Sequence, residues 1–191
     1  MKKSVVRCIF ILLLTCLNIV TYAQNSETNI TKSDSLIIVA MDPEKGFHHD
    51  YILFIPKGTP LKKKLYLLVE PNNTGKLSDS IEVHKKYAID LAAVSSVGNN
   101  ISTELNIPLL VPVFPRLESQ PLMYTHALDR DIVLEKSKQL KRLDLQLLEM
   151  IDDAGKVLAS MDIRVEPEIF MNGFSASGTF TNRFSFIHPG K

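Results

Sequence analysis

Short apolar runs alternate along this chain with segments of helical periodicity. Residues 65–69 and 109–114 are almost entirely apolar, as in strands buried on both faces, and residues 168–172 can form a third strand. Residues 80–97 predict a helix between the first two runs. From Leu140 to Met161 apolar residues recur at three- and four-residue steps, which predicts a longer amphipathic helix. This order is typical of crossover units, so we expect an α/β fold with a mostly parallel sheet and flanking helices.

Two further apolar runs precede these units. Residues 36–40 and 51–55 are separated by the turn-rich sequence Asp42-Pro43-Glu44-Lys45-Gly46. This spacing predicts two antiparallel strands at one edge of the sheet. Residues 24–35, which come before them, are a polar leader without apolar periodicity.

The first 23 residues have the three-part pattern of a secretory signal peptide. Three basic residues precede an apolar stretch at 8–20, and Thr21-Tyr22-Ala23 supplies small residues where a signal peptidase cleaves. A transmembrane helix would need about 20 predominantly apolar residues, and this stretch is shorter. We therefore expect a periplasmic or secreted protein that begins at Gln24. Lipid attachment at Cys16 is the alternative.

Cleavage at that point changes the composition of the mature chain. Both cysteines, Cys8 and Cys16, would be lost, so the mature chain would form neither disulfides nor a thiolate metal site. The 22 basic residues fall to 19 against 21 acidic ones, a net charge of −2 with neutral histidines. This balance provides no basic field for nucleic acid, and we expect no stable membrane span in the mature chain.

No cofactor or metal is expected. The sequence contains no glycine-rich phosphate loop of the P-loop or dinucleotide type. His48-His49-Asp50 brings potential metal ligands together in sequence, but adjacent residues on a strand or turn point in different directions. The mature part is long enough for one domain of ordinary size.

The sequence Gly173-Phe174-Ser175-Ala176-Ser177-Gly178 is the one motif that carries chemistry. It lies between the predicted strand 168–172 and a predicted helix, where a serine in a strained turn can project its hydroxyl above the sheet. The small residues at 173 and 177 would let the helix fold back on the strand. The N–H groups at the start of the helix would favour negative charge near the hydroxyl. A Gly/Ser-rich turn without chemistry is the alternative, and the strand-to-helix position favours the first reading.

With this motif and order of elements, residues 36–191 resemble the α/β-hydrolase superfamily, and specifically its secreted esterase and depolymerase-like branch. The resemblance implies that Ser175 is a nucleophile and that the backbone N–H of Ala176 is one oxyanion donor. A second donor would come from the loop after 65–69, where Asn72 is our choice. The chain departs from the family pattern twice: Ser177 stands where glycine is usual, and Pro71-Asn72 stands near the usual His-Gly.

The family mechanism also needs a histidine and an acid, which follow the serine in chain order. Only 16 residues follow Ser175. We therefore expect residues 36–191 to be the N-terminal part of a hydrolase domain, with the acid and histidine beyond residue 191, and the 191-residue chain to be inactive alone. His188 is expected at the far end of the helix after the motif, away from Ser175.

Among the other histidines, His126 follows the 109–114 run. Loops at this end of a parallel sheet line the active-site face, so His126 is a candidate for contact with substrate. A loop histidine that makes only local hydrogen bonds is the competing interpretation. Arg116 and Arg130, near the same rim, are candidates for pairing with an acidic substrate or with neighbouring aspartates.

Two classes of function remain open. The first is an exported serine hydrolase that cleaves a small-molecule or polymer-derived carboxylic ester through an acyl-enzyme. A serine peptidase of the same superfamily is its close rival. The second is a non-catalytic exported binding protein that keeps a degenerate hydrolase fold.

Overall fold

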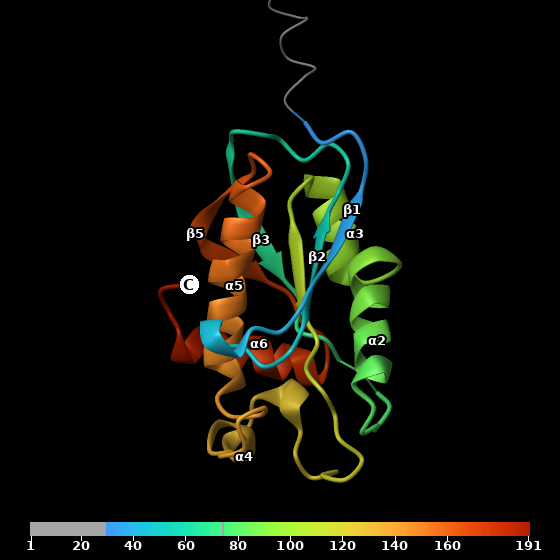
Figure 1. Ribbon diagram of the computed structural model, residues 1–191, viewed down its shortest axis with the longest axis vertical. Coiled ribbons are helices and arrows are strands. Elements are labelled where there is room, and N and C mark those ends of the chain that lie inside the picture. Colours follow the sequence, from blue (N-terminus) through green and yellow to red (C-terminus); the bar gives the residue numbers. More distant parts are fainter. Residues whose placement is uncertain (1–29, 74) are drawn as a thin grey trace, which may run out of the picture. The chain divides into compact units, whose positions relative to one another are not determined.

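The computed structural model describes residues 30–191 except residue 74. The predicted signal peptide, with Cys8, Cys16 and the cleavage site, and residues 24–29 of the leader lie outside the described residues. Five strands form one sheet in the order β1-β2-β4-β3-β5 (Figure 1). Their bounds are β1 Ser35–Val39, β2 Tyr51–Ile55, β3 Lys64–Val69, β4 Leu109–Pro112 and β5 Arg164–Met171.

The sheet is mostly parallel, as the sequence predicts. β4, β3 and β5 pair in parallel, whereas β2 is antiparallel to both β1 and β4. Four of the five strands therefore share one direction. The predicted edge hairpin is also confirmed, with Leu36 of β1 opposite Phe54 of β2.

Helices cover both faces of this sheet. Figure 1 shows α2 and α3 on one face and α5 on the other, with α6 crossing near the carboxyl ends of the strands. Apolar side chains from α2 and α5 pack on opposite faces, in two separate clusters. The helices are α2 Ile81–Ala93, α3 Val97–Leu105, α4 Arg130–Val133, α5 Leu143–Ala159 and α6 Ala176–Ile187, with 3-10 turns η1 Pro43–Lys45 and η2 Thr125–Ala127.

The predicted helix over 80–97 is wrong in extent, because two helices occupy this region. α2 ends at Ala93, and Ser96 starts α3 by accepting a hydrogen bond from the Asn99 N–H at 2.8 Å. A serine at this position satisfies one of the N–H groups that a new helix leaves unpaired. Ser96 therefore begins a second helix within the stretch predicted as one.

β5 differs from the prediction in both length and shape. It begins at Arg164, four residues before the predicted start, and includes Pro167. Leu65 faces Val165 but Leu67 faces Ile169, so β5 carries two extra residues in a bulge around the proline. A proline has no N–H to donate to the neighbouring strand, which is why it is tolerated at a bulge or an edge.

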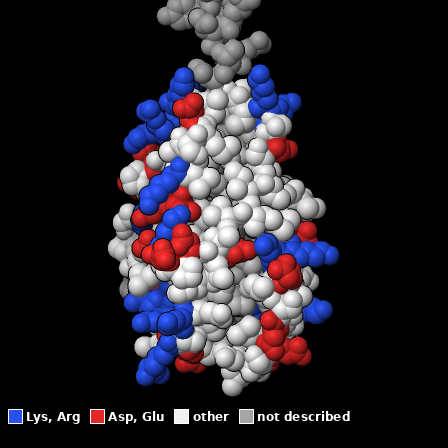
Figure 2. All heavy atoms as spheres, viewed as in Figure 1, with Lys and Arg blue, Asp and Glu red and all other residues white. Residues whose placement is uncertain are grey.

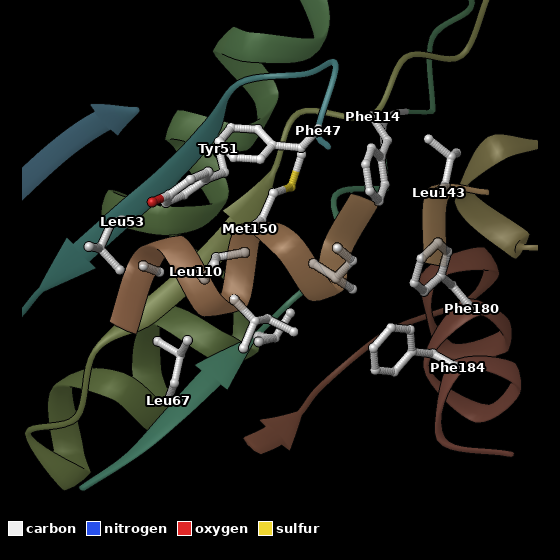
Figure 3. Close-up of a cluster of buried hydrophobic side chains, with 14 of the residues drawn as sticks. Phe47, Tyr51, Leu53, Leu67, Leu110, Phe114, Leu143, Met150, Phe180 and Phe184 are labelled. Atoms are coloured by element: carbon white, nitrogen blue, oxygen red, sulfur yellow. The ribbon is translucent and has the colours of Figure 1, made fainter. Parts of the chain in front are cut away.

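Aromatic side chains hold α6 against the larger core. Phe180 and Phe184 are almost fully buried and point from α6 toward Leu143 of α5 and Phe114 after β4 (Figure 3). The rings of Phe114 and Phe180 have their centroids 5.8 Å apart. Losing one such phenylalanine typically costs about 3–5 kcal/mol. This packing fixes the start of α6, and hence the turn that precedes it.

The surface carries charges of both signs. On the face shown in Figure 2, lysine and arginine side chains are interspersed with aspartate and glutamate on both sides of a band of uncharged residues. Within residues 30–191, apart from residue 74, no helix has both the length and the apolar character needed to cross a membrane.

Candidate active site

Ser175 lies in the sharp turn between β5 and α6. Its backbone has φ 57° and ψ −118°, and the residue is exposed. A side-chain-bearing residue rarely adopts this conformation, which costs of order 1–3 kcal/mol and is most often found at functional sites. The Ser175 hydroxyl caps no N–H group of α6. The strained backbone of Ser175 therefore destabilises the fold slightly, and its exposed hydroxyl makes no capping bond to α6 in return.

Gly173 and Ser177 explain how the chain makes this turn. A Cβ atom on Gly173 would lie 2.4 Å from the Ser177 carbonyl oxygen, so only glycine fits there. The buried Ser177 hydroxyl accepts from the Phe174 N–H and donates to the Phe174 carbonyl, both at 3.0 Å. Ser177 thus adds two hydrogen bonds across the turn. At the next residue, Gly178, the helix backbone comes close to Gly173: a Cβ on Gly178 would lie 3.2 Å from the Gly173 carbonyl oxygen.

Ala176 is the first residue of α6. The first N–H groups of a helix have no carbonyl partner within the helix, and here the first bond of α6 back to the turn is from the Thr179 N–H to the Ser175 carbonyl, 3.1 Å. The Ala176 N–H therefore lies at the positive end of the helix dipole, next to Ser175. Its role as an oxyanion donor stays a prediction.

Asn72 and Asn73, in the loop after β3, bond to two different segments of the chain. The fully buried Asn72 side chain donates to the Phe114 carbonyl at 2.8 Å and accepts from the Phe114 N–H at 3.1 Å. Asn73 donates from its side chain to the Phe174 carbonyl at 2.8 Å. The structure thus brings the loop of the second predicted donor against the Ser175 turn. Whether the Asn72 N–H itself serves as that donor stays a prediction.

Asn73 is not among the site residues that the sequence predicts. The available signal was a second amide side chain directly after Asn72, in a turn that follows a buried strand, since asparagine side chains commonly bond to nearby backbone. Because Phe174 lies far from Asn73 in the sequence, no local pattern indicates that it is the hydrogen-bond partner.

His126 is fully buried in η2. Neither of its ring nitrogens has a hydrogen-bond partner among the described residues. Burial, followed by the nearby His84 and Arg116, lowers the pKa of His126 to about 3. The ring is therefore neutral over the ordinary pH range, and its contact with substrate stays a prediction.

His188 lies at the opposite end of α6 from Ser175, where it is the C-cap residue. Its Nε2 is 2.9 Å from the Asp144 carboxylate, which also accepts two hydrogen bonds from the Arg142 guanidinium at 2.7 and 2.9 Å. Burial works to raise the pKa of Asp144, but these hydrogen bonds outweigh it and lower the value below the ordinary range. The histidine and acid of this pair connect the end of α6 to the start of α5.

His49 and Asp50, which the sequence brings together as potential metal ligands next to β2, contact different partners. The Nε2 of the buried His49 lies 2.9 Å from the Gln139 carbonyl, and burial lowers the pKa of His49 to about 4. Asp50 pairs with Lys85 at 2.7 Å. Among the described residues, no three histidine, cysteine, aspartate or glutamate side chains are grouped so that they could hold a metal ion.

Glu70, the first residue after β3, is a buried acid close to the end of the sheet. Its carboxylate accepts from the Ser96 hydroxyl and the Gly98 N–H, both at 2.8 Å. Burial raises the pKa of Glu70 despite these bonds, which work in the opposite direction. The partners both belong to the start of α3, so Glu70 stabilises the N-terminus of that helix.

Comparisons with known proteins find similarity in structure alone. No family model matches the chain, and neither does any curated protein sequence. The structure of poly(aspartic acid) hydrolase-1 from Sphingomonas sp. KT-1 aligns over 84% of this chain and 53% of its own, with a TM-score of 0.50 and 15% identity. A thermostable esterase aligns over 82% of this chain and 38% of its own, with a TM-score of 0.49 and 21% identity.

The chain thus spans about half the length of the first of these structures and less of the second. The likeness to the first structure, at a TM-score of 0.50, concerns the fold alone, and at that level the resemblance seen in the sequence is confirmed. The chain has an α/β-hydrolase-like fold.

Proposed function

We propose that this chain is the N-terminal part of an exported serine hydrolase that cleaves carboxylic esters through Ser175. The backbone of Ser175, with φ 57° and ψ −118° at the start of α6, is the observation that carries the proposal. An exposed serine in this conformation, between a parallel strand and a helix, has the geometry of a nucleophile elbow. A simple Gly/Ser turn would have no reason to hold a non-glycine residue in a strained conformation.

The chemistry would be acyl transfer. The Ser175 oxygen attacks the ester carbonyl, the alcohol leaves, and water then hydrolyses the acyl-enzyme. The Ala176 N–H and a donor from the loop at Asn72 stabilise the oxyanion of each tetrahedral intermediate. Loss of one such donor typically costs about 2.7–4 kcal/mol in the barrier.

We expect the catalytic histidine and its acid in sequence beyond residue 191. His188 is unsuited to act on Ser175, because the 12 residues of α6 separate them by about 18 Å at 1.5 Å per residue. Its Nε2 is also engaged by Asp144. His126 is buried, and its low pKa makes it a weak base.

The test uses the complete reading frame, sequenced past the Lys191 codon and expressed with its own N-terminus. We expect a fluorophosphonate probe to label the purified protein on Ser175 and the protein to hydrolyse p-nitrophenyl esters. Ser175→Ala should abolish both activities. Ser185→Ala is the matched control, since Ser185 is exposed on the same helix and its hydroxyl donates to the Thr181 carbonyl.

Two other results would decide against the proposal. A complete protein that neither reacts with the probe nor cleaves esters would support the non-catalytic binding protein. A protein that is labelled on Ser175 but cleaves only peptide substrates would keep the nucleophile and replace the esterase with a peptidase.

A further inference from the structure

Three nitrogen-bearing side chains from different elements meet beside the loop after β3. His84 comes from α2, Arg116 from the segment after β4, and His126 from η2. The two imidazole rings have their centroids 6.5 Å apart, and the His84 Nε2 lies 2.9 Å from the Ser78 carbonyl oxygen and 3.3 Å from the Arg116 backbone nitrogen. Tyr124 joins the group, with its ring 4.4 Å below the Arg116 guanidinium and 6.2 Å from the His126 ring.

Several nitrogens of this cluster are buried with no hydrogen-bond partner in the part of the chain that the structure describes. They are Nδ1 of His84, Nε of Arg116, and both Nδ1 and Nε2 of His126. An unsatisfied buried polar group destabilises the folded state, and folded proteins leave few of them. Four on three neighbouring residues are a concentration that packing alone does not explain. The Arg116 Nε and one His126 nitrogen carry a hydrogen in every accessible protonation state, so the cluster always holds donors.

The charge of the cluster has no counterpart in the described part of the chain. None of the ion pairs between described residues includes Arg116. After burial, His84 and Arg116 are the causes that lower the pKa of His126. The surroundings of His126 therefore disfavour another positive charge, and a negative group placed there would be stabilised.

The position of the cluster connects it to the proposed active site. The Arg116 Nη1 donates to the Gly75 carbonyl at 3.1 Å, and Gly75 belongs to the same loop as Asn72. Arg116 and Tyr124 are half-buried, whereas His126 lies fully buried behind them. An anionic group that approaches from solvent would meet the guanidinium before the imidazoles.

We propose that Arg116, His84 and His126 form a carboxylate-binding site, so that the substrate is an ester or amide that carries an acidic group. This substrate class rests on the proposed function, whereas the binding site does not depend on catalysis. A carboxylate would accept from the Arg116 Nε–H and from a His126 ring N–H. To admit it, the segment 115–126 must shift, because His126 has no exposed surface in this structure.

The test measures binding of succinate to the mature protein by calorimetry, with the neutral diamide succinamide as the probe control. We expect saturable succinate binding, no succinamide binding, and an affinity at least tenfold lower in Arg116→Gln and His126→Phe. His48→Phe is the matched control, because His48 lies outside the cluster, and it should bind like the wild type.

A second readout separates a ligand site from a structural one. If the His126 nitrogens serve a ligand, His126→Phe removes the unsatisfied groups and keeps a planar aromatic ring, so the ligand-free protein should have an unchanged or higher Tm. A lower Tm together with unchanged succinate affinity would overturn the site. So would a crystal structure in which ordered waters satisfy the four nitrogens and remain there in saturating succinate.

The experiments can reject the carboxylate site and the serine hydrolase separately. Ester hydrolysis by a protein that binds no succinate would reject the carboxylate site and keep the serine hydrolase. Succinate binding that depends on Arg116 and His126, in a complete protein without hydrolytic activity, would keep the site and reject the enzyme.

Discussion

The side-chain amide of Asn73 donates a hydrogen bond to the Phe174 carbonyl at 2.8 Å, and so joins the loop after β3 to the turn that presents Ser175. The two residues are 101 positions apart in the chain. In an oxyanion hole the distance between nucleophile and donor decides how strongly the intermediate is stabilised. This contact therefore couples the two halves of the proposed site.

Replacing Asn73 tests that coupling. Asn73→Asp keeps the size of the side chain but removes the donor and sets a carboxylate against the Phe174 carbonyl. If the contact positions the oxyanion donor, we expect kcat of the complete enzyme to fall by about tenfold with little change in KM. A displaced donor stabilises the transition state less but leaves the binding of the substrate unchanged. Steady-state kinetics with a p-nitrophenyl ester measure it. Asn100→Asp, on the exposed side of α3, is the control, and equal kcat in both variants would contradict the role.

Gly173→Ala should unfold or strongly destabilise the protein. The added Cβ would lie 2.4 Å from the Ser177 carbonyl oxygen, and backbone atoms of a helix start cannot move aside cheaply. We expect a loss of about 3 kcal/mol or more in the free energy of unfolding, at the upper end of overpacking costs. Urea denaturation followed by circular dichroism gives the value. Gly190→Ala should be nearly neutral, because its Cβ would meet nothing within 4 Å, and a similar small effect at Gly173 would refute the tight turn.

Asp144→Asn tests the clamp between α5 and α6. The buried carboxylate accepts from Arg142 and His188, and hydrogen bonds to a charged group contribute about 1.5–3 kcal/mol. We expect a loss of about 2 kcal/mol in the free energy of unfolding at pH 7. Asp152→Asn is the control on the same helix, where the exposed pair with Lys191 should be worth less than about 1 kcal/mol.

The same variant should also change the pH dependence of stability. The pKa of Asp144 is lower in the folded protein than its ordinary value of 3.8. Its contribution is therefore present above about pH 4 and is lost as the pH falls through the lower folded value. Unfolding curves between pH 7 and pH 2 should show the wild type and Asp144→Asn converging at the acid end. A constant difference would mean that the charge of Asp144 is not responsible.

The N-terminal residue of the exported protein can be determined directly. If residues 1–23 are a cleaved signal peptide, mass spectrometry of the exported protein should find a chain that begins at Gln24 and lacks Cys8 and Cys16. Cys16→Ser should leave export and this N-terminus unchanged. Loss of membrane attachment in Cys16→Ser would instead identify a lipid anchor.

Much of the fold follows from local sequence pattern. The strands β1 to β4 lie within a few residues of the apolar runs that predict them, and α5 coincides with most of the 140–161 periodicity. These predictions succeed because a buried strand or an amphipathic helix needs a repeating set of apolar side chains wherever it packs. The break between α2 and α3 was missed, since the capping role of Ser96 competes with a helical pattern that continues through it.

For the site, the order of residues around Ser175 already predicts a strained turn between a strand and a helix. The structure adds the reason that Ser177 replaces the usual glycine: its hydroxyl bonds to both backbone groups of Phe174. The bulge at Pro167 was missed, because it depends on how β5 pairs with β3 and not on β5 alone.

By itself, the sequence determined the alternation of strands and helices and the position of the strained turn at Ser175, because periodicity and small residues act over a few positions. Only the tertiary structure decided that Asn73 meets Phe174, that His188 pairs with Asp144 at the far end of α6, and that His84, Arg116 and His126 gather beside the loop after β3. Each of these contacts joins residues that lie far apart in the chain. Their meeting depends on strand order, register and helix packing, and none of these is visible in the local pattern around a single residue.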